Sequence, residues 1–359
     1  MASDETIFLT GFPGFIAGRL VERLASDGGA RFVLLVLPQG ELVRRAHEDI
    51  TRISAATGVP VENFRVVEGD ITLPELGLAP DDLELARRET TSLFHLAAVY
   101  DLGVERELAM RVNVEGTRHV NQFAQTLQNL RRYNYVSTCY VAGLRTGRIL
   151  ESELRHDAGF HNYYEETKYL AELEVEALKP TLPVTIYRPS VVCGDSQTGE
   201  TAKYDGIYYL INYLRIHPRL LSFANIGNRD VRLNVVPVDF VVEAIAALAK
   251  DDRAVGATLQ LADPAPLTTH ELFDAIARAL VAHTSHLTIP APLVRATLDI
   301  PISEKLTGLP RVGVPYFFTK QTYDITRAQT LLEPHDLGCP PFPSYVDALV
   351  RFVAQHPKL

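Results

Sequence analysis

A tyrosine and a lysine near the middle of the chain are spaced one helical turn apart. Tyr164 and Lys168, in "YYEETK", occupy positions i and i+4 of a stretch that is predicted to be helical over about 162–178, so both side chains should lie on one helix face. A free phenol has a pKa of about 10, and acting as an acid or base near neutral pH requires its phenolate to be stabilised by about 4 kcal/mol. A neighbouring ammonium supplies stabilisation of that sign, so the pair is suited to general acid/base chemistry.

The chain holds a second tyrosine–lysine pair at the same spacing, Tyr316 and Lys320 in "YFFTK". Sequence context separates the two pairs. Thr138 ends the strand predicted in "YNYVST", upstream of the first pair, where its hydroxyl would project from the carboxyl edge of a sheet. The second pair lies in a proline-flanked segment without a comparable strand-end hydroxyl upstream. We therefore expect Thr138 to act with Tyr164 and Lys168, and we expect Tyr316 to have no catalytic role.

A glycine-rich turn, "LTGFPGFIAG" at residues 9–18, lies between a predicted strand and a predicted helix over about 14–26. Its G-x-x-G-x-x-A spacing departs from the G-x-G-x-x-G fingerprint, but its context is that of a dinucleotide-binding turn. Gly11 would permit the tight turn, Gly14 would let the backbone approach a pyrophosphate, and Ala17 would allow close helix-to-strand packing. The alternative is a βα turn without a ligand. Beside a bound dinucleotide, Lys168 would hold the nicotinamide ribose hydroxyls.

The end of the second predicted strand bears on which dinucleotide is bound. An acidic residue there would bind the ribose 2′-hydroxyl of NAD(H), but this strand ends in "LPQ" (37–39). Arg44 and Arg45 follow closely and could meet the 2′-phosphate of NADP(H), unless they only form a solvated helix face. Asp70, in "EGDI" at the end of the third strand, could reach the adenine amino group or serve as a turn residue. We expect NADP(H) as the preferred cofactor, with NAD(H) as the alternative.

Short β-branched runs alternate with helical patterns from residue 6 onward, and the apolar runs are nearly continuous. This rhythm predicts an α/β fold with a doubly wound, Rossmann-type parallel sheet that binds its ligands at the carboxyl ends of the strands. We expect residues 1–194 to form the NAD(P)-binding domain, with 235–262 and part of the C-terminus returning to it. Residues 195–234 and 263–330 would form a smaller substrate-binding lobe, built from insertions in the C-terminal half.

Composition argues against several classes of partner. The 359 residues carry a net charge of -9, which provides no electrostatic footprint for nucleic acid and disfavours anionic membranes. The apolar stretches fall far short of the roughly 20 residues that a bilayer-spanning helix needs. The N-terminus "MASDETIFL" lacks the regions of a secretory leader, and the three cysteines have no disulfide or metal-site spacing. We expect a cytoplasmic protein without a transmembrane anchor or a bound metal.

Two groups of residues could imitate a functional site. Cys139 follows Thr138 and could accept an acyl group, but hydride transfer needs no covalent intermediate, so we expect a packed thiol. His156, Asp157 and His161, in "RHDAGFH", could imitate a metal cluster. Their spacing does not stack two histidines on one helix face, so we expect a substrate-side loop instead.

Seven motifs in their order along the chain resemble the extended short-chain dehydrogenase/reductase superfamily. They are "TGFPGFIAG", "GDI", "HLAA" (95–98), "NVEGT" (113–117), "VSTCYVAG" (136–143), the Tyr164–Lys168 pair and "YRPSVVCG" (187–194). Within the superfamily, "GFPGFIAG" and "VSTCYVAG" are most similar to the branch that contains fatty acyl reductases and the thioester reductase domains of carboxylic acid reductases. Ala17 departs from that branch, whose members commonly have glycine at this position.

The resemblance implies a role for each of the candidate catalytic residues. Tyr164 would be the acid/base, Lys168 its electrostatic partner and Thr138 the hydroxyl that polarises the reacting oxygen, with Asn113 in a fourth, supporting position. Pro189 and the residues after it would line the nicotinamide. The candidate cofactor-binding residues are Gly11, Phe12, Pro13, Gly14, Phe15, Ile16, Arg44, Arg45, Asp70, Ile71, Leu96, Ala97, Ala98, Lys168, Pro189 and Val191.

Together these features predict an NADP(H)-preferring oxidoreductase that moves hydride between nicotinamide and a carbonyl or acyl-thioester carbon. We expect a bulky, mainly apolar small-molecule substrate, with an acyl group carried on CoA or on a separate carrier protein. The first candidate for an apolar pocket wall is the tyrosine-rich segment 203–221, with Tyr204, Tyr208, Tyr209 and Tyr213. The alternatives are an NAD-dependent sugar-nucleotide epimerase or dehydratase and a non-catalytic dinucleotide sensor. The resemblance also implies a homodimer.

Overall fold

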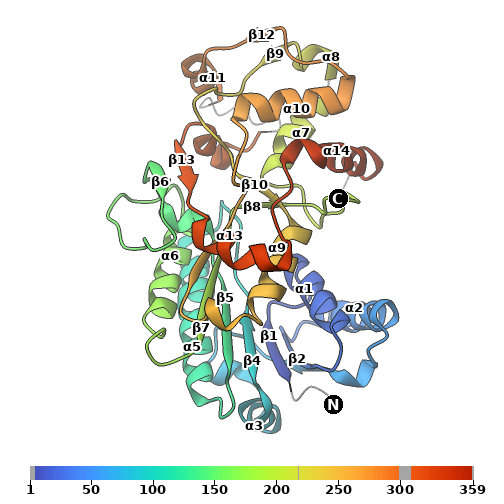
Figure 1. Ribbon diagram of the computed structural model, residues 1–359, viewed down its shortest axis with the longest axis vertical. Helices are drawn as coiled ribbons and strands as arrows, with labels where there is room; N and C mark the ends of the chain where they lie inside the picture. The colour runs from blue at the N-terminus through green and yellow to red at the C-terminus, as the bar shows by residue number, and fades with distance from the viewer. Residues whose placement is uncertain (1–4, 217, 299–308, 358–359) are drawn as a thin grey trace.

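The computed structural model describes residues 5–216, 218–298 and 309–357, and it consists of a helix-flanked sheet with a smaller lobe beyond it (Figure 1). Seven parallel strands form the sheet in the order β11-β7-β5-β4-β1-β2-β3. Their bounds are β1 Thr6–Thr10, β2 Arg31–Val36, β3 Phe64–Glu68, β4 Ser92–His95, β5 Arg132–Val136, β7 Val184–Pro189 and β11 Thr258–Leu261. The predicted doubly wound parallel sheet is confirmed.

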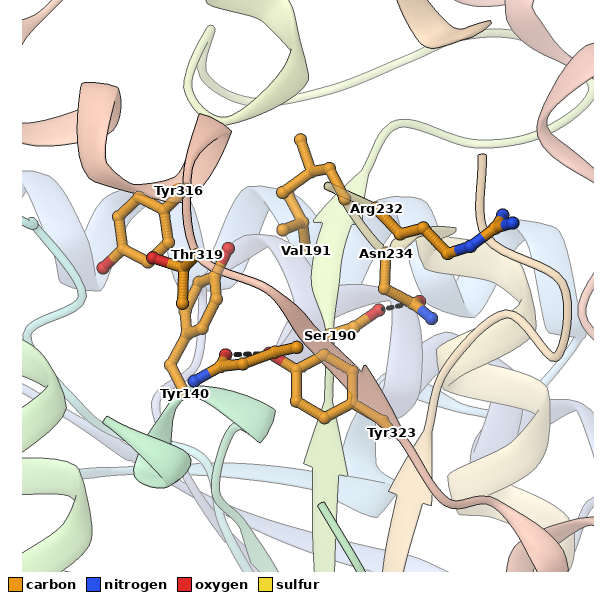
Figure 2. Close-up of a pocket in the computed structure, with 10 residues that line it drawn as sticks. Tyr140, Ser190, Val191, Arg232, Asn234, Tyr316, Thr319 and Tyr323 are labelled. Atoms are coloured by element: carbon orange, nitrogen blue, oxygen red, sulfur yellow. Dashed lines mark hydrogen bonds between the residues drawn. The ribbon is translucent and has the colours of Figure 1, made fainter. Parts of the chain in front are cut away.

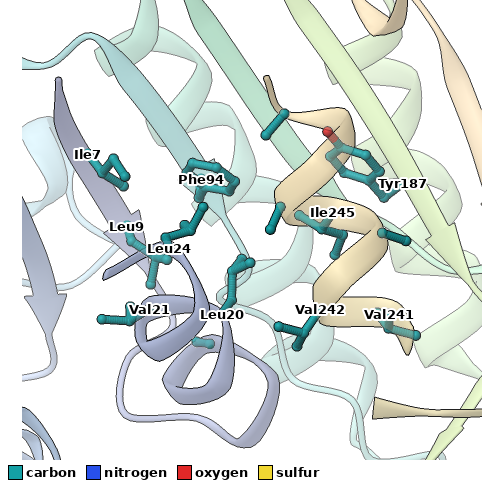
Figure 3. Close-up of a cluster of buried hydrophobic side chains, with 14 of the residues drawn as sticks. Ile7, Leu9, Leu20, Val21, Leu24, Phe94, Tyr187, Val241, Val242 and Ile245 are labelled. Atoms are coloured by element: carbon teal, nitrogen blue, oxygen red, sulfur yellow. The ribbon is translucent and has the colours of Figure 1, made fainter. Parts of the chain in front are cut away.

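The sheet is buried on both faces, which explains why its strands are apolar without alternation. Figure 3 shows one face, where Ile7 and Leu9 of β1 pack against Leu20 of helix α1 and Val242 of helix α9. Phe8, between the two β1 residues, points to the opposite face and packs in a second cluster. Successive strand residues point to opposite faces, so helices on both sides are needed to exclude water.

The helices predicted over about 14–26 and 162–178 are found as α1 and α6, each within two residues of the predicted bounds. A π-helical segment at Met110–Glu115 separates α4 from α5. The helices of this part are α1 Phe15–Ser26, α2 Gly40–Thr57, α3 Pro80–Glu89, α4 Arg106–Ala109, α5 Gly116–Thr126, α6 Tyr163–Glu176, α9 Val238–Leu248 and α13 Thr326–Leu332.

The smaller lobe is built from segments that follow β7, and its core is a third apolar cluster between α7, α10 and α14. Three short parallel pairs, β8–β10, β9–β12 and β6–β13, complete the fold. The bounds are β6 Gly147–Ile149, β8 Val191–Cys193, α7 Ile207–Ile216, α8 Pro218–Leu221, β9 Ala224–Asn225, β10 Val235–Pro237, α10 Thr269–Val281, β12 Leu287–Thr288, α11 Ala291–Leu298, β13 Gln321–Tyr323 and α14 Val346–Gln355.

The chain passes between the two parts several times. After β8 it forms α7 in the lobe, then returns through β10, and α9 packs against α1 beside the sheet. Near the C-terminus, α13 packs against α9 and β11, whereas α14 packs on α7 and α10 in the lobe. Of the predicted lobe, residues 299–308 lie outside the described residues, as do residues 1–4 of the predicted NAD(P)-binding domain. Within the described ranges, no helix is both long and apolar enough to cross a membrane.

Candidate functional site

Thr138 and Tyr164 meet where strand β5 ends. Thr138 lies two residues beyond β5 and caps a 3₁₀ helix at Cys139–Ala142, its Oγ1 accepting a hydrogen bond from the backbone N–H of Tyr140 at 3.2 Å. The Thr138 hydroxyl also lies close enough to the Tyr164 phenol to lower its pKa. The strand-end hydroxyl and the phenol, which are far apart in sequence, therefore face the same point.

Lys168 fixes helix α6 to the same strand end. Its side chain is 4% exposed, and Nζ donates to the carbonyl of Val136 at 2.9 Å and to the hydroxyl of Tyr135 at 3.0 Å. Both partners lie at the end of β5, immediately before Thr138. Because Tyr164 is one turn earlier on α6, the structure brings Thr138, Tyr164 and Lys168 together at one edge of the sheet.

Burial controls the protonation of the phenol and the ammonium. Burial raises the pKa of Tyr164 to about 12, and the nearby Thr138 hydroxyl opposes that change only in part. Burial also lowers the pKa of Lys168 to about 8, while the nearby Glu172 carboxylate acts in the opposite direction. At neutral pH the phenol therefore holds its proton and the amine is largely charged, so Tyr164 is set up to donate a proton rather than to remove one.

Asn113 joins two segments that border this edge. It lies in the π-helical segment before α5 and is 1% exposed. Its Oδ1 accepts from the backbone N–H of Val99 at 2.8 Å, and its Nδ2 donates to the Val99 carbonyl and to Thr167 Oγ1, both at 3.0 Å. Asn113 thus holds the loop after β4 against α6, next to Lys168, and the wider π turn accommodates its inward side chain.

A buried ion pair lies beneath Lys168, and the sequence interpretation missed it. Glu172, fully buried on α6, accepts two hydrogen bonds from the Arg188 guanidinium at 2.9 and 2.5 Å and one from the Ser137 hydroxyl. These residues come from α6, from β7 and from the end of β5, which carry Lys168, Pro189 and Thr138 respectively. The available signal was the position of Glu172, one further turn along the helix from Lys168.

The glycine turn packs tightly against the segment after β4. Gly11 has φ +95°, and a Cβ added there would lie 2.8 Å from the backbone nitrogen of Ala97. A Cβ on Gly14 would lie 2.7 Å from the carbonyl oxygen of Gly11, whose oxygen also accepts from the Gly14 N–H. No side chain caps the N-terminus of α1, so the N–H groups of its first turn remain open to an anion. These features fit a diphosphate at the point where the strand order reverses around β1.

The other candidate cofactor residues fall into an enclosed and an accessible set. Phe12 and Pro13 are buried beneath the turn, and Ile71 is buried against the helix-flanked sheet. Asp70 Oδ1 accepts from the backbone N–H of Thr72 at 2.8 Å. This bond is the one expected if Asp70 serves as a turn residue. The partly exposed residues are Phe15, Ile16, Leu96, Ala97, Ala98 and Val191.

The two arginines of α2 differ in their pairing. Arg44 bonds to Glu48 at 2.5 Å and lies 4.0 Å from Glu41, so part of its charge is already compensated on its own helix. Arg45 is exposed and forms no ion pair within the described part of the chain. Of the two, Arg45 is the one whose guanidinium remains open to a phosphate.

A narrow pocket adjoins this edge, and Figure 2 shows its lining. Its aromatic residues are Tyr140, Tyr316 and Tyr323, and the four tyrosines of segment 203–221 do not contribute to it. Tyr208 instead packs in the lobe core, where its hydroxyl accepts from the Gly194 N–H at 2.8 Å. The pocket is therefore lined by phenols and amides more than by aliphatic side chains.

Residues of the less favoured sites have other partners. The Tyr316 hydroxyl donates to Glu165 at 2.5 Å, whereas Lys320 reaches the exposed Asp230 at 3.4 Å, so the second tyrosine–lysine pair is not joined. The Cys139 thiol donates to the Arg188 carbonyl, and burial raises its pKa, which disfavours a nucleophilic thiolate. Among the residues described, no cluster of metal-ligating side chains occurs.

The chain is similar in sequence to a known protein family and to several characterised proteins. Residues 9–245 match an NAD-binding family whose description is male sterility protein. The chain is 26% identical over 282 residues to the fatty acyl-CoA reductase wat of Drosophila melanogaster, covering 69% of the chain and 54% of that protein. It is also 26% identical over 293 residues to the glycine betaine reductase ATRR of Emericella nidulans, covering 76% of the chain and 22% of that protein. The chain thus spans only about half, or less, of the length of these relatives.

Two solved structures share the fold. The terminal R domain from the myxalamid PKS-NRPS biosynthetic pathway has a TM-score of 0.82 and 24% identity, covering 99% of this chain and 92% of that one. A UDP-glucuronic acid 4-epimerase from Bacillus cereus, in complex with NAD, has a TM-score of 0.67 and 16% identity, covering 98% of this chain and 100% of that one. At these identities the likeness concerns the fold, which both this R domain and an epimerase adopt.

The buried ion pair predicts a difference between two glutamates on α6. Replacing Glu172 with Ala leaves the Arg188 guanidinium buried without its carboxylate, so the free energy of unfolding should fall by about 3–5 kcal/mol. Glu174→Ala removes only a partly exposed pair with Arg118 and should cost less than about 1 kcal/mol. Urea unfolding of both variants measures the difference, and equal losses would contradict the importance given to the buried pair.

Proposed function

The chain belongs to the male sterility protein family, and from this premise we propose that it is an NADP(H)-preferring reductase of carbonyl and acyl-thioester substrates. The chain is an NAD(P)-dependent oxidoreductase of the short-chain dehydrogenase/reductase type. The observation that carries the finer proposal is the meeting of Thr138, Tyr164 and Lys168 at the sheet edge, next to the open helix N-terminus of the glycine turn.

In the proposed reaction, the protein's own side chains bind and protonate the oxygen of the substrate carbonyl. Thr138 and Tyr164 would both contact that oxygen, and the protonated phenol would donate its proton as the carbonyl becomes a hydroxyl. The ammonium of Lys168 would favour negative charge on the phenol oxygen after the transfer. A bound nicotinamide supplies the hydride in such chemistry.

The proposed cofactor contacts come from the glycine turn, from α2 and from the sheet edge beside Thr138. The turn at Gly11 and Gly14 and the first N–H groups of α1 would hold the diphosphate. Lys168 would hold the ribose hydroxyls beside the nicotinamide, Pro189 and Val191 would line its ring, and Arg45 would meet a 2′-phosphate. Asn113 would act at a distance, by keeping the loop after β4 in place against α6.

Support for a thioester substrate comes from what the relatives are named for. One relative is a fatty acyl-CoA reductase, and one structural neighbour is the R domain of a biosynthetic assembly line. We propose acyl thioesters on CoA or on a carrier protein as the first substrates to test, with aldehydes and ketones beside them. A screen that follows NADPH and NADH consumption in parallel tests this proposal. Lack of turnover, with NAD⁺ retained through purification, would favour an epimerase instead.

The proton donor can be tested with two neighbouring tyrosines. Tyr164→Phe removes the proton-donating hydroxyl and should lower kcat by about 10²–10⁴-fold while leaving NADPH binding nearly intact. Tyr163→Phe is the matched control, because that residue is 45% exposed on the same helix turn, and it should retain turnover. NADPH consumption and calorimetric nucleotide binding provide the two readouts. Unchanged turnover in Tyr164→Phe would refute the assigned role.

The pKa of Lys168 predicts the alkaline limb of the pH profile. Because burial lowers that pKa to about 8, the ammonium is present below pH 8 and is lost above it, so kcat/KM for reduction should fall above about pH 8. Tyr164 remains protonated throughout this range. Lys168→Arg keeps the positive charge and should move the decline to higher pH. A decline that is unchanged in Lys168→Arg would argue against the assignment of this limb to Lys168.

A second carboxylate beside the phenol also titrates near neutral pH. Burial raises the pKa of Glu165 to about 7, so any separate inflection near pH 7 should disappear in Glu165→Gln.

Cofactor preference should depend on Arg45 more than on Arg44. Removing a guanidinium that binds a phosphate costs the energy of a charged hydrogen bond, so Arg45→Ala should lower the NADPH-to-NADH ratio of kcat/KM by about 10-fold or more. Arg44→Ala should change the ratio less, since Arg44 is paired with Glu48. Steady-state kinetics with both cofactors measures the ratio, and a wild-type preference for NADH would contradict the proposal.

A further inference from the structure

The narrow pocket lies next to the sheet edge that carries Thr138, on the side of the smaller lobe (Figure 2). Tyr140 enters it two residues after Thr138, Val191 enters from β8, and Tyr316 and Tyr323 enter from the segment before α13. Its internal space is about 20 Å³, which accommodates about one water-sized group. A group that binds there is therefore small, and it lies close to the proposed reacting carbonyl because Tyr140 adjoins Thr138.

Nearly all polar side chains of the pocket already have partners. The Tyr316 hydroxyl donates to Glu165 at 2.5 Å and accepts from Asn162 at 2.9 Å. The Tyr323 hydroxyl donates to Gln321 Oε1 at 3.1 Å. The remaining pairs are Ser190 with Asn234, Thr319 with His161, and Gln321 with the carbonyls of Gly143 and Arg145. Arg232 is exposed, and its guanidinium donates to the Pro266 carbonyl.

The Tyr140 hydroxyl is the exception. It makes no hydrogen bond to any side chain or backbone group in the described ranges, and Figure 2 shows it directed between Tyr316 and Val191. Burial raises the pKa of Tyr140 well above its ordinary value, so the hydroxyl remains a donor at any physiological pH.

The Tyr140 ring is held in place from two sides. Its backbone N–H donates to Thr138 Oγ1 at 3.2 Å, and its ring packs against that of Tyr316 with centroids 4.6 Å apart and the planes tilted by 38°. Tyr316 is itself fixed by Glu165, the residue after Tyr164. The hydroxyl is thus positioned before substrate arrives, and little conformational entropy is lost when it binds.

We propose that Tyr140 is a specificity-determining residue whose hydroxyl donates a hydrogen bond to an oxygen on the acyl chain near the reacting carbonyl, such as a 3-hydroxy or 3-oxo group. This inference rests on the proposed reductase function and names the substrate class of the same site. A plain alkyl chain offers the Tyr140 hydroxyl no acceptor, whereas a chain with an oxygen close to the reacting carbonyl offers one. The apolar body of a large substrate would then lie outside this pocket.

The test compares two CoA thioesters of equal chain length, 3-hydroxyhexanoyl-CoA and hexanoyl-CoA. The wild-type protein should favour the hydroxylated substrate in kcat/KM by about 10-fold, the effect of one well-placed hydrogen bond. Tyr140→Phe should bring the ratio close to one. Tyr323→Phe is the matched control, because its hydroxyl is used by Gln321, and the ratio should persist. A wild-type ratio near one, or a ratio that survives in Tyr140→Phe, overturns the inference.

A binding measurement separates this inference from the proposed function. If the wild-type protein reduces neither thioester, nor any aldehyde or ketone, the reductase proposal fails by itself. Calorimetric titration with 1-hexanol and hexane-1,3-diol then tests Tyr140 without turnover. Tighter binding of the diol by the wild type, lost in Tyr140→Phe and kept in Tyr323→Phe, supports the hydrogen-bond donor. Equal binding of both alcohols by the wild type, or an unchanged preference in Tyr140→Phe, counts against it.

Discussion

The ammonium of Lys168 is the interaction on which the rest of the site depends. It is bound to the Val136 carbonyl and the Tyr135 hydroxyl, so it joins helix α6 to the end of β5, beside Thr138. A charge this deeply buried is costly, and burial lowers its pKa to about 8 as a result. Glu172 offsets part of that cost, and two hydrogen bonds from Arg188 to one oxygen of Glu172 keep it in place. The charge of Lys168 and the geometry of three elements are thus maintained by one buried network.

The sequence predicted the parts of this arrangement that local rules govern. An i, i+4 pair on a helix must share a face, and a residue just beyond a parallel strand must lie at the carboxyl edge, so these two rules were enough to place Tyr164, Lys168 and Thr138. The parallel sheet followed equally from the uninterrupted apolar strands. The partners of Glu172 could not be predicted, because Arg188 and Ser137 reach it only after α6 has packed on β5 and β7.

Tyrosines illustrate the same limit on the substrate side. Segment 203–221 has the aromatic pattern of a pocket wall, yet Tyr208 belongs to the lobe core and the hydroxyl of Tyr204 bonds to the His356 carbonyl near the C-terminus. Aromatic residues at helical spacing predict that one helix face is buried, but they do not predict whether it packs against the protein core or against a ligand. Conversely, Tyr316 has a tyrosine–lysine spacing in sequence, but its position in space is set by a carboxylate from a distant helix.

Glu165 connects helix α6 to the segment that lines the narrow pocket. It directly follows Tyr164 on α6, and it accepts a hydrogen bond from the hydroxyl of Tyr316, which lines the pocket. Asn162 and His161, just before the helix, bond to Tyr316 and Thr319 of the same segment. The first turn of α6 therefore carries both the proposed proton donor and the contacts that hold the substrate-side wall. The segment that lines the pocket is therefore joined directly to the helical turn that carries Tyr164.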